Sequence, residues 1–197
     1  MLRSYAALDS VSLQAGSGFC QPAQSLPQRV SLDDSAVSVM TDLKLVSAVI
    51  IRPSDGVDEA NQRMIQRGVR LLLVVDENRM VAGIITATDI LGEKPLQVIT
   101  GRGGRREDVL VRDIMTPQHR LEVLRMDEVR SAKVGHLVAT LKKSGRQHAV
   151  AVDVDRDGRQ TVRGLFSATQ IARQLGVAIQ TSEVAQTFSE IEAQLAR

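Results

Sequence analysis

Gly83-Ile84-Ile85-Thr86-Ala87-Thr88-Asp89-Ile90 returns later in the chain as Gly164-Leu165-Phe166-Ser167-Ala168-Thr169-Gln170-Ile171. In each copy an apolar run typical of a strand ends at a hydroxyl residue, and a helical pattern follows. A hydroxyl at a helix start, beside the free N–H groups of the first turn, suits an anion. One difference matters chemically, because Gln170 stands where the first copy has Asp89. The chain therefore contains an internal repeat whose two copies are expected to differ in function.

The repeat extends on both sides of this pattern. Met40-Thr41 aligns with Met115-Thr116, Gly68 with Gly145, and Val74-Val75-Asp76 with Ala151-Val152-Asp153. The extra residues of the second copy fall in loops, and four of them lie between Asp153 and Gly164, where Asp155-Arg156-Asp157-Gly158 supplies the turn of a longer β-hairpin. The first copy closes the same hairpin with Glu77-Asn78-Arg79.

Each copy predicts the order β-α-β-β-α, so the fold class is α/β (α+β) with two similar units. In the first copy we expect strands at 46–51, 71–76 and 80–85, a helix from Val57 (with Ala60, Met64 and Ile65 on its apolar face) to a stop at Gly68, and a helix from Thr86. In the second we expect strands at 121–126, 149–153 and 161–166, a helix capped by Ser131, carrying Val134, Leu137, Val138 and Leu141 and stopped by Gly145, and a helix from Ser167.

These boundaries divide the chain into five parts. We expect a poorly ordered N-terminal arm at 1–34, the first repeat at 35–100, a linker at 101–110, the second repeat at 111–176, and an amphipathic C-terminal helix at 177–197. Val184, Phe188, Ile191 and Leu195 form a narrow apolar stripe on that last helix. The stripe suits packing onto the protein's own body or onto a second subunit.

The composition is that of a globular protein, with 43% hydrophobic and 24% charged residues. Aromatic residues make up only 2%, so the core must be aliphatic. No apolar run reaches the roughly 18 residues of a membrane helix, and polar residues such as Asp9 and Ser10 interrupt any signal-peptide pattern. The single cysteine, Cys20, fits a reducing compartment. We therefore expect a cytoplasmic protein.

The formal net charge of +2 is too small to indicate nucleic-acid binding by itself. Positive charge does gather in Gly101-Arg102-Gly103-Gly104-Arg105-Arg106, which Glu107 and Asp108 follow. This run suits a solvated linker, and a phosphate-contacting or RNA-binding role is the alternative.

Taken together, these features resemble a tandem pair of CBS domains, the family named after cystathionine β-synthase. The resemblance rests on the β-α-β-β-α order, Val74-Val75-Asp76, the Gly-apolar-apolar-Thr-x-x-Asp string at Gly83 to Asp89, and Val111-Arg112-Asp113-Ile114-Met115-Thr116-Pro117. It covers roughly residues 38–176 and implies that the two units pack about a pseudo-twofold axis. Many members of the family bind AMP, ADP, ATP or S-adenosylmethionine in clefts between the paired domains.

The resemblance implies a nucleotide site at Thr86, near the phosphates, and at Asp89, on the ribose. A carboxylate can accept from both ribose hydroxyls, and such charge-assisted bonds are stronger than neutral ones. The adenine base is expected against Val49, Ile50 and Ile51. At the second site Ser167 and Gln170 bring no charge, so this cleft is expected to be empty, weaker or altered in preference, with His148 as a further candidate that is either structural or faces the cleft.

A structural alternative explains the same residues. Thr86-x-x-Asp89 and Ser167-x-x-Gln170 both fit a capping box, in which the third residue after the hydroxyl reaches back to the N–H of the cap. For Ser167 and Gln170 this alternative is preferred, whereas for Asp89 capping and ribose recognition stay open.

The sequence offers no catalytic constellation. His119, His136 and His148 are scattered and show no zinc spacing, Asp76 and Asp153 suit turns at strand ends, and no Walker-type loop is present. We expect no enzyme, no metal and no required cofactor. The leading hypothesis is a regulatory sensor that binds an adenine nucleotide, forms a homodimer and signals to a partner protein. A ligand-free interaction module and an RNA- or DNA-binding protein are the alternatives, the last weakened by the lack of aromatic side chains for base stacking.

Overall fold

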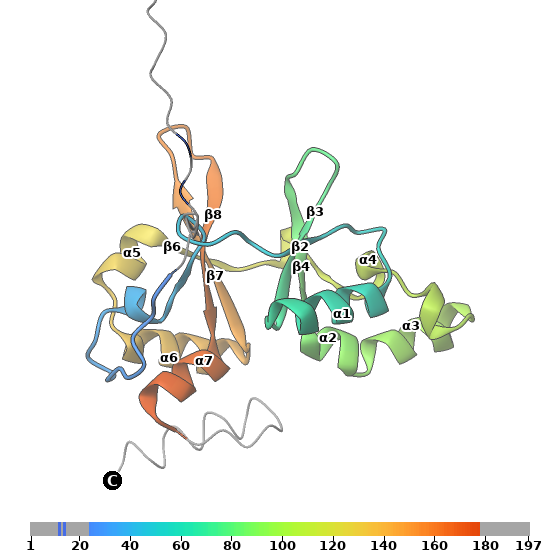
Figure 1. The fold of residues 1–197 in the computed structure, drawn as a ribbon. Coiled ribbons are helices and arrows are strands. Elements are labelled where there is room, and N and C mark those ends of the chain that lie inside the picture. The colour runs from blue at the N-terminus through green and yellow to red at the C-terminus, as the bar shows by residue number, and fades with distance from the viewer. Residues whose placement is uncertain (1–11, 13, 15–23, 178–197) are drawn as a thin grey trace, which may run out of the picture.

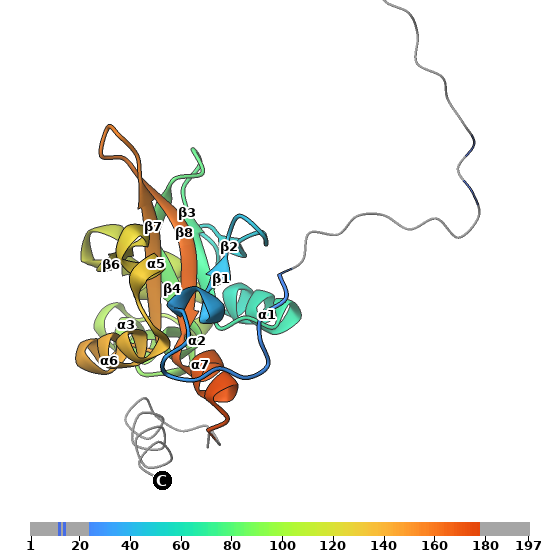
Figure 2. The same ribbon diagram turned by 90° about the vertical axis from the view of Figure 1, so that its left-hand side faces the viewer.

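The computed structural model describes residues 12, 14 and 24–177. Two four-stranded sheets stand side by side, and each carries helices on the side away from the other (Figure 1). Figure 2 views the molecule from the second repeat and shows both long hairpins pointing to the same end. The strand orders β2-β3-β4-β5 and β1-β8-β7-β6 are those of two copies of one sheet.

The first sheet contains β2, the parallel strand β3 and the antiparallel strand β4. Its helices begin and end with the expected signals, since Gly68 stops α1 in the left-handed conformation at φ 63° and Thr86 caps α2. The elements are β2 (Ile50–Ile51), α1 (Val57–Arg67), β3 (Leu71–Val75), β4 (Val81–Thr86), α2 (Ala87–Leu91), α3 (Lys94–Arg102) and the short 3-10 helix η2 (Arg106–Asp108).

The second sheet repeats this arrangement. Here β6 runs parallel to β7, β7 pairs with β8, and Gly145 ends α6 at φ 63°. The elements are the 3-10 helix η3 (Gln118–Arg120), β6 (Val123–Arg125), α5 (Met126–Ser131), α6 (Val134–Ser144), β7 (His148–Val154), β8 (Gln160–Ser167) and α7 (Ala168–Leu175).

The segment before each repeat crosses to the sheet of the other repeat. The first crossing segment consists of η1 (Ala36–Val39) and β1 (Thr41–Asp42), the second of α4 (Val111–Ile114) and β5 (Thr116–Pro117). Thr41 pairs with Leu165 of β8, and Thr116 pairs with Ile84 of β4. Because these registers are equivalent in the two copies, the crossing obeys the pseudo-twofold symmetry and ties the repeats together.

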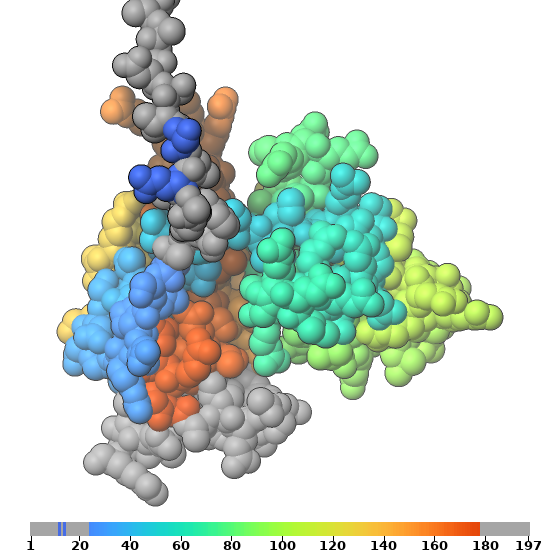
Figure 3. Space-filling view, viewed as in Figure 1, coloured from blue at the N-terminus to red at the C-terminus, as the bar shows by residue number. Residues whose placement is uncertain are grey.

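Buried side chains form three layers. Each sheet packs its outer face on its own helices, with Leu72, Val74 and Ile85 in the first repeat and Phe166 in the second. The inner faces meet in a third cluster that joins Leu71, Leu73, Val75 and Ile84 to Val150. Strand β3 is buried along its whole length because both of its faces are covered. Figure 3 shows the two repeats in contact along a seam.

Several predicted boundaries differ from the structure. Of the strand expected at 46–51 only Ile50–Ile51 is a strand, and Ile65 is 71% exposed on α1 instead of lying on its buried face. Ser131 does not cap α6, because it ends the separate helix α5 and Lys133 occupies the cap position. The sequence reasoning did not anticipate α3 or α5. The apolar stripe at 184–195 lies outside the described residues.

The described part of the N-terminal segment, residues 24–34, packs on the second repeat. Val30 N–H donates to the Gln174 carbonyl at 2.9 Å, and the buried Gln174 side chain donates to the Pro27 carbonyl at 2.7 Å. Gln24 holds the crossing strand by bonds to the Met40 carbonyl and the Asp42 N–H, each at 2.8 Å.

Gly83 supports a stability prediction at the crossing. A Cβ at Gly83 would collide with the backbone carbonyl of Thr116 on β5, so Gly83→Ala must displace a paired strand. We expect a loss of about 2 kcal/mol in the free energy of unfolding, measured by urea denaturation. In the control Gly101→Ala, where a Cβ meets no atom within 4 Å, stability should stay equal or rise slightly. Equal stability of Gly83→Ala and wild type would contradict the tight crossing.

Candidate functional site: two clefts between the repeats

Two clefts lie at the end of the sheets opposite the hairpin turns. Each combines the start of the closing helix of one repeat with the start of the hairpin strand of the other. The Thr86 cleft has a volume of about 230 Å³ and includes Ile84, Thr86, Thr88, Asp89, Thr116, Leu121, Glu122, Gly145, Arg146, Gln147, His148 and Val150. The Ser167 cleft has about 680 Å³ and includes Arg29, Thr41, Gly68, Val69, Arg70, Leu71, His148, Leu165, Phe166, Ser167, Thr169, Gln170, Arg173, Gly176 and Val177.

The repeat explains why both clefts exist. Gly68 and Gly145 end their helices in the left-handed conformation and turn the chain into β3 and β7. The first residues of those strands pair with the hydroxyl residues that open α2 and α7, Leu71 with Thr86 and His148 with Ser167. The same local signals therefore bring two helix N-termini to equivalent places.

In the Thr86 cleft the Asp89 carboxylate folds back on its own helix. Asp89 Oδ2 accepts from Thr86 N–H at 2.8 Å and from Thr86 Oγ1 at 2.7 Å, which makes a capping box. Its other oxygen, Oδ1, accepts from Lys94 Nζ at 2.5 Å, and Lys94 also donates to the Ile114 carbonyl at 3.1 Å. The side chain of Asp89 is 12% exposed. Ribose binding at Asp89 would require the carboxylate to give up its hydrogen bonds with Thr86 or Lys94 in exchange for bonds from the ribose hydroxyls.

The other polar groups of the Thr86 cleft are paired as well. Arg146 forms an ion pair with Glu122 at 3.1 Å, and Thr88 Oγ1 donates to Gln147 Oε1 at 3.2 Å. The charges that line this cleft therefore have partners already.

The Ser167 cleft is built from equivalent residues with different chemistry. The Ser167 hydroxyl makes no capping hydrogen bond, so the N-terminus of α7 is not closed as that of α2 is. Gln170 donates its amide to Gln174 Oε1 at 3.4 Å, away from the cap. Arg29, Arg70 and Arg173 line the cleft, and within the described residues none of them has an acidic partner within 4.0 Å.

His148 lines both clefts. Burial and the nearby Arg70 cation lower the pKa of His148 to about 4, although the Asp89 carboxylate acts in the opposite direction. The imidazole is therefore neutral at neutral pH. Leu71 occupies the equivalent position in the first repeat, which shows that the fold accepts an apolar residue there.

The expected base-binding residues do not lie beside Asp89. Ile51 is buried in the core of the first repeat and Val49 packs against that core. Ile50 contacts the layer between the sheets. None of the three lines the Thr86 or the Ser167 cleft, and Ile50 and Ile51 line a separate cavity near Arg52 and Arg63.

Sequence reasoning missed the arginines of the Ser167 cleft. The repeat itself carried a signal for Arg70. His148 follows the helix stop at Gly145 and was already a candidate, and Arg70 follows the equivalent helix stop at Gly68. Arg29 had no such signal, since it comes from the segment before the first repeat.

The arginines of the run 101–106 are paired within the described residues. Arg102 binds Asp113 with 3.0 and 2.8 Å bonds, Arg105 pairs with Glu107 at 3.2 Å, and Arg106 pairs with Asp58 at 2.9 Å. Burial alone would raise the pKa of Asp113, but hydrogen bonds from Arg102 and from the Leu110 N–H outweigh it and lower the pKa. The run therefore brings little unpaired positive charge.

The residues that the structure describes contain no group of three or more His, Cys, Asp or Glu side chains placed to hold a metal ion. They also contain no helix with the length and hydropathy needed to span a membrane.

Comparison with known proteins gives a family match for part of the chain and a similar fold for most of it. Residues 36–95 match the CBS domain family. An uncharacterized conserved protein from Pyrococcus horikoshii superposes with a TM-score of 0.54 at 20% identity, over 78% of this chain and 100% of that one. The CBS domain pair of protein MJ0100, solved with 5′-methylthioadenosine and S-adenosyl-L-methionine, gives 0.50 at 19% identity, over 73% and 97%. CBSX2, a CBS-pair protein from Arabidopsis thaliana, gives 0.48 at 22%, over 72% and 93%. No curated protein matches the sequence.

Proposed function

We propose that this chain is a regulatory pair of CBS domains that binds an adenosine compound between its two repeats. A match of residues 36–95 to the CBS domain family supports this proposal. The candidate ligands are AMP, ADP, ATP and S-adenosylmethionine. The main support for this proposal is the size of the Ser167 cleft. Its volume of about 680 Å³ lies within the range of small-molecule sites, roughly 300 to 1,000 Å³. The MJ0100 pair, which has a similar fold, was solved with two adenosyl compounds.

Ligand binding there can act on the arrangement of the repeats. The cleft is lined by Gly68 to Leu71 from the first repeat and by Leu165 to Val177 from the second. A ligand that touches both favours one relative orientation in proportion to its differential affinity for that orientation. We propose that a separate partner protein reads this change, and that the module itself is not catalytic.

Matched substitutions in the two clefts test the site. Thr169 and Thr88 occupy equivalent positions in the first turns of α7 and α2, and each lines its own cleft. Thr169→Trp should fill the Ser167 cleft and weaken nucleotide binding at least about tenfold in calorimetric titrations, because the indole takes the ligand's volume. Thr88→Trp should leave binding within about twofold of wild type.

The opposite result would assign the nucleotide site to the other cleft. Loss of binding in Thr88→Trp alone would place the ligand beside Thr86 and Asp89, and Asp89→Ala should then weaken it too. If wild type binds none of AMP, ADP, ATP and S-adenosylmethionine, the nucleotide proposal fails. In that case the alternative is favoured, a CBS pair that serves as a ligand-free interaction module, because the charges that line the Thr86 cleft are already paired with one another.

The RNA- or DNA-binding alternative has less support. Arg102, Arg105 and Arg106 are engaged with acidic side chains, so few free cations remain for phosphates in this run. Salt-sensitive binding of a short oligonucleotide, with no nucleotide binding, would revive it.

We also propose a homodimer in the cytoplasm. Ile65, Leu91 and Leu96 are about two-thirds exposed or more on helices of the first repeat, at 71%, 67% and 66%. Exposed aliphatic side chains on neighbouring helices suit a protein interface. Light scattering should give twice the mass of the 21.5 kDa chain, and a monomer at all concentrations would contradict the dimer. The single cysteine fits the reducing cytoplasm.

A further inference from the structure

We infer that the Ser167 cleft selects its ligand by phosphate charge and not by ribose, so that it binds a phosphate-bearing adenosine compound and accepts its 2′-deoxy form. This inference rests on the proposed function and names the ligand class of the same cleft. It has two supports: the arginines that line the cleft, and Gln170 in place of Asp89, which changes both the helix N-terminus and the group that would face a ribose.

The charges of the Ser167 cleft have one sign. Arg29, Arg70 and Arg173 are exposed side chains that line it, and among the residues that the structure describes no Asp or Glu does. In the Thr86 cleft, by contrast, Asp89 is neutralised by Lys94 and Glu122 by Arg146. Cations without partners attract an anion into a concave site, and a guanidinium matches the geometry of a phosphate better than an ammonium does.

The N-termini of α2 and α7 also differ in whether they are free to bind an anion. At α2 the position for an anion is already filled, because the Asp89 carboxylate accepts from Thr86. At α7 the equivalent residue is Gln170, which turns to Gln174, and the Ser167 hydroxyl does not cap the helix. Ala168 N–H donates to the Gln147 carbonyl at 2.9 Å, so the group left available to an oxyanion at this helix start is the Ser167 hydroxyl, beside the N–H groups that follow Ala168 and have no side-chain cap.

The same substitution removes the usual basis for ribose selection. A carboxylate that accepts from a ribose hydroxyl gives a charge-assisted bond, whereas Gln170 offers at most a neutral one. Loss of a neutral hydrogen bond changes affinity by a small factor. The 2′-hydroxyl is therefore expected to contribute little, and the positive sulfonium of S-adenosylmethionine to be disfavoured beside three arginines.

Calorimetric titration of the full chain with ADP, 2′-deoxy-ADP, adenosine and S-adenosylmethionine tests this selection. We expect 2′-deoxy-ADP to bind within about fivefold of ADP, and adenosine and S-adenosylmethionine to bind at least about tenfold more weakly than ADP. Arg173→Gln should weaken the binding of ADP about tenfold and leave the affinity for adenosine unchanged. Arg70→Gln provides a second variant of the same kind.

Arg156→Gln is the matched control, because it removes the same charge from the exposed β7–β8 turn, away from both clefts. It should bind ADP like wild type. Equal affinity for adenosine and ADP, a loss above about tenfold for 2′-deoxy-ADP, or arginine variants that bind ADP like wild type would overturn the inference and leave the proposed function standing. Binding of none of the four ligands by wild type would overturn both.

Discussion

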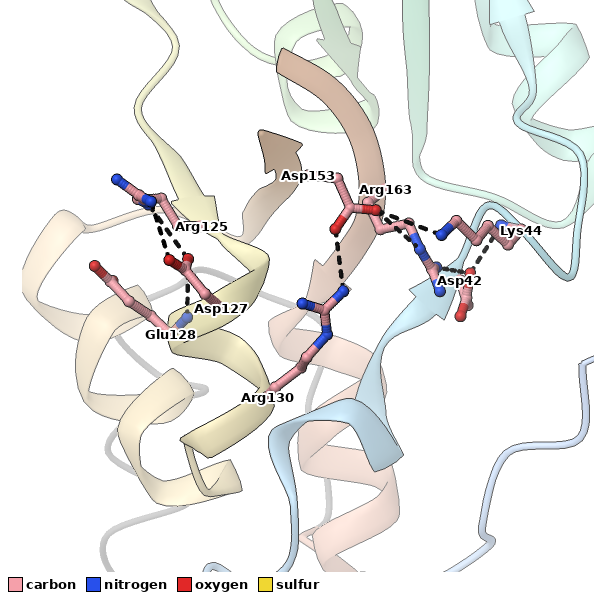
Figure 4. A network of polar contacts seen from close by, with 8 residues as sticks. All are labelled: Asp42, Lys44, Arg125, Asp127, Glu128, Arg130, Asp153 and Arg163. Atoms are coloured by element: carbon pink, nitrogen blue, oxygen red, sulfur yellow. Dashed lines mark hydrogen bonds and ion pairs between the residues drawn. The ribbon is translucent and has the colours of Figure 1, made fainter. Parts of the chain in front are cut away.

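Asp42→Ala should lower the free energy of unfolding by about 2 to 3 kcal/mol, because it leaves the half-buried Arg163 with a weaker set of partners. Asp42 lies at the end of the crossing strand β1, and its carboxylate binds the Arg163 guanidinium of β8 (Figure 4). The two side chains are only 10% and 15% exposed. The pair therefore fastens the segment before the first repeat to the sheet of the second.

The expected loss lies below that of a fully isolated buried charge because Arg163 keeps one ion-pair contact. Its buried Nε makes no hydrogen bond but lies 3.4 Å from Asp153 Oδ2, and Asp153 also contacts Arg130 at 3.2 Å and Lys44 at 3.7 Å (Figure 4). The substitution additionally removes the 2.7 Å bond from the Lys44 N–H to Asp42 Oδ1. Urea denaturation of wild type and variant measures the difference.

The pair Arg125 and Asp127 in the same region supplies the control (Figure 4). It joins the same residue types at 3.0 Å, but its side chains are 58% and 60% exposed. Asp127→Ala should leave stability nearly unchanged, because solvent and salt screen such a pair. Equal losses in Asp42→Ala and Asp127→Ala would show that the crossing strand is held by other contacts.

The sequence was informative where one local pattern determines the structure. The alternation and turn residues around Glu77 to Arg79 and Asp155 to Gly158 predicted both hairpins, and the glycines at 68 and 145 predicted both helix ends. The α+β class with two equivalent units is confirmed for the same reason, since it rests on a pattern that occurs twice. The match to the CBS domain family covers residues 36–95, within the first of these units.

The remaining features depend on distant contacts. Strands β1 and β5 contain two residues each, too few for a periodic pattern, and their pairing with the opposite repeat follows from the packing of the whole chain. The capping box at Thr86 was visible as an alternative, but the partner Lys94 lies beyond Gly92, on a helix that the pattern did not reveal. The volume of the Ser167 cleft depends in part on Arg29, from a segment with no recognisable pattern.

His148→Leu should make stability less sensitive to acid, which is the second large effect that we expect. The folded-state pKa of His148 is lowered to about 4 by burial and by Arg70, against an ordinary value of 6.5. Between these values the unfolded chain binds a proton that the folded chain does not, so the free energy of unfolding falls as the pH falls. Above pH 6.5 both states are neutral at this residue and the full contribution is present.

The size of the effect follows from the same shift. The lowering of the His148 pKa from 6.5 to about 4 corresponds to a stability contribution of roughly 3 kcal/mol, lost progressively from about pH 6.5 to about pH 4. Urea denaturation from pH 4 to pH 8 should show a smaller decline for His148→Leu than for wild type. Leucine is a suitable replacement because Leu71 occupies the equivalent position in the first repeat.

The difference between the two proteins in the pH dependence of the free energy of unfolding reports on the His148 imidazole, because carboxylates such as Asp113 titrate in both proteins. His119→Gln, at an exposed position in η3, removes a histidine away from the clefts and should follow the wild-type curve. Parallel curves for His148→Leu and wild type would mean that protonated His148 is accommodated in the folded protein. Since His148 lines both clefts, that outcome would also require one of them to admit enough water, or a rearranged Asp89, to stabilise the cation.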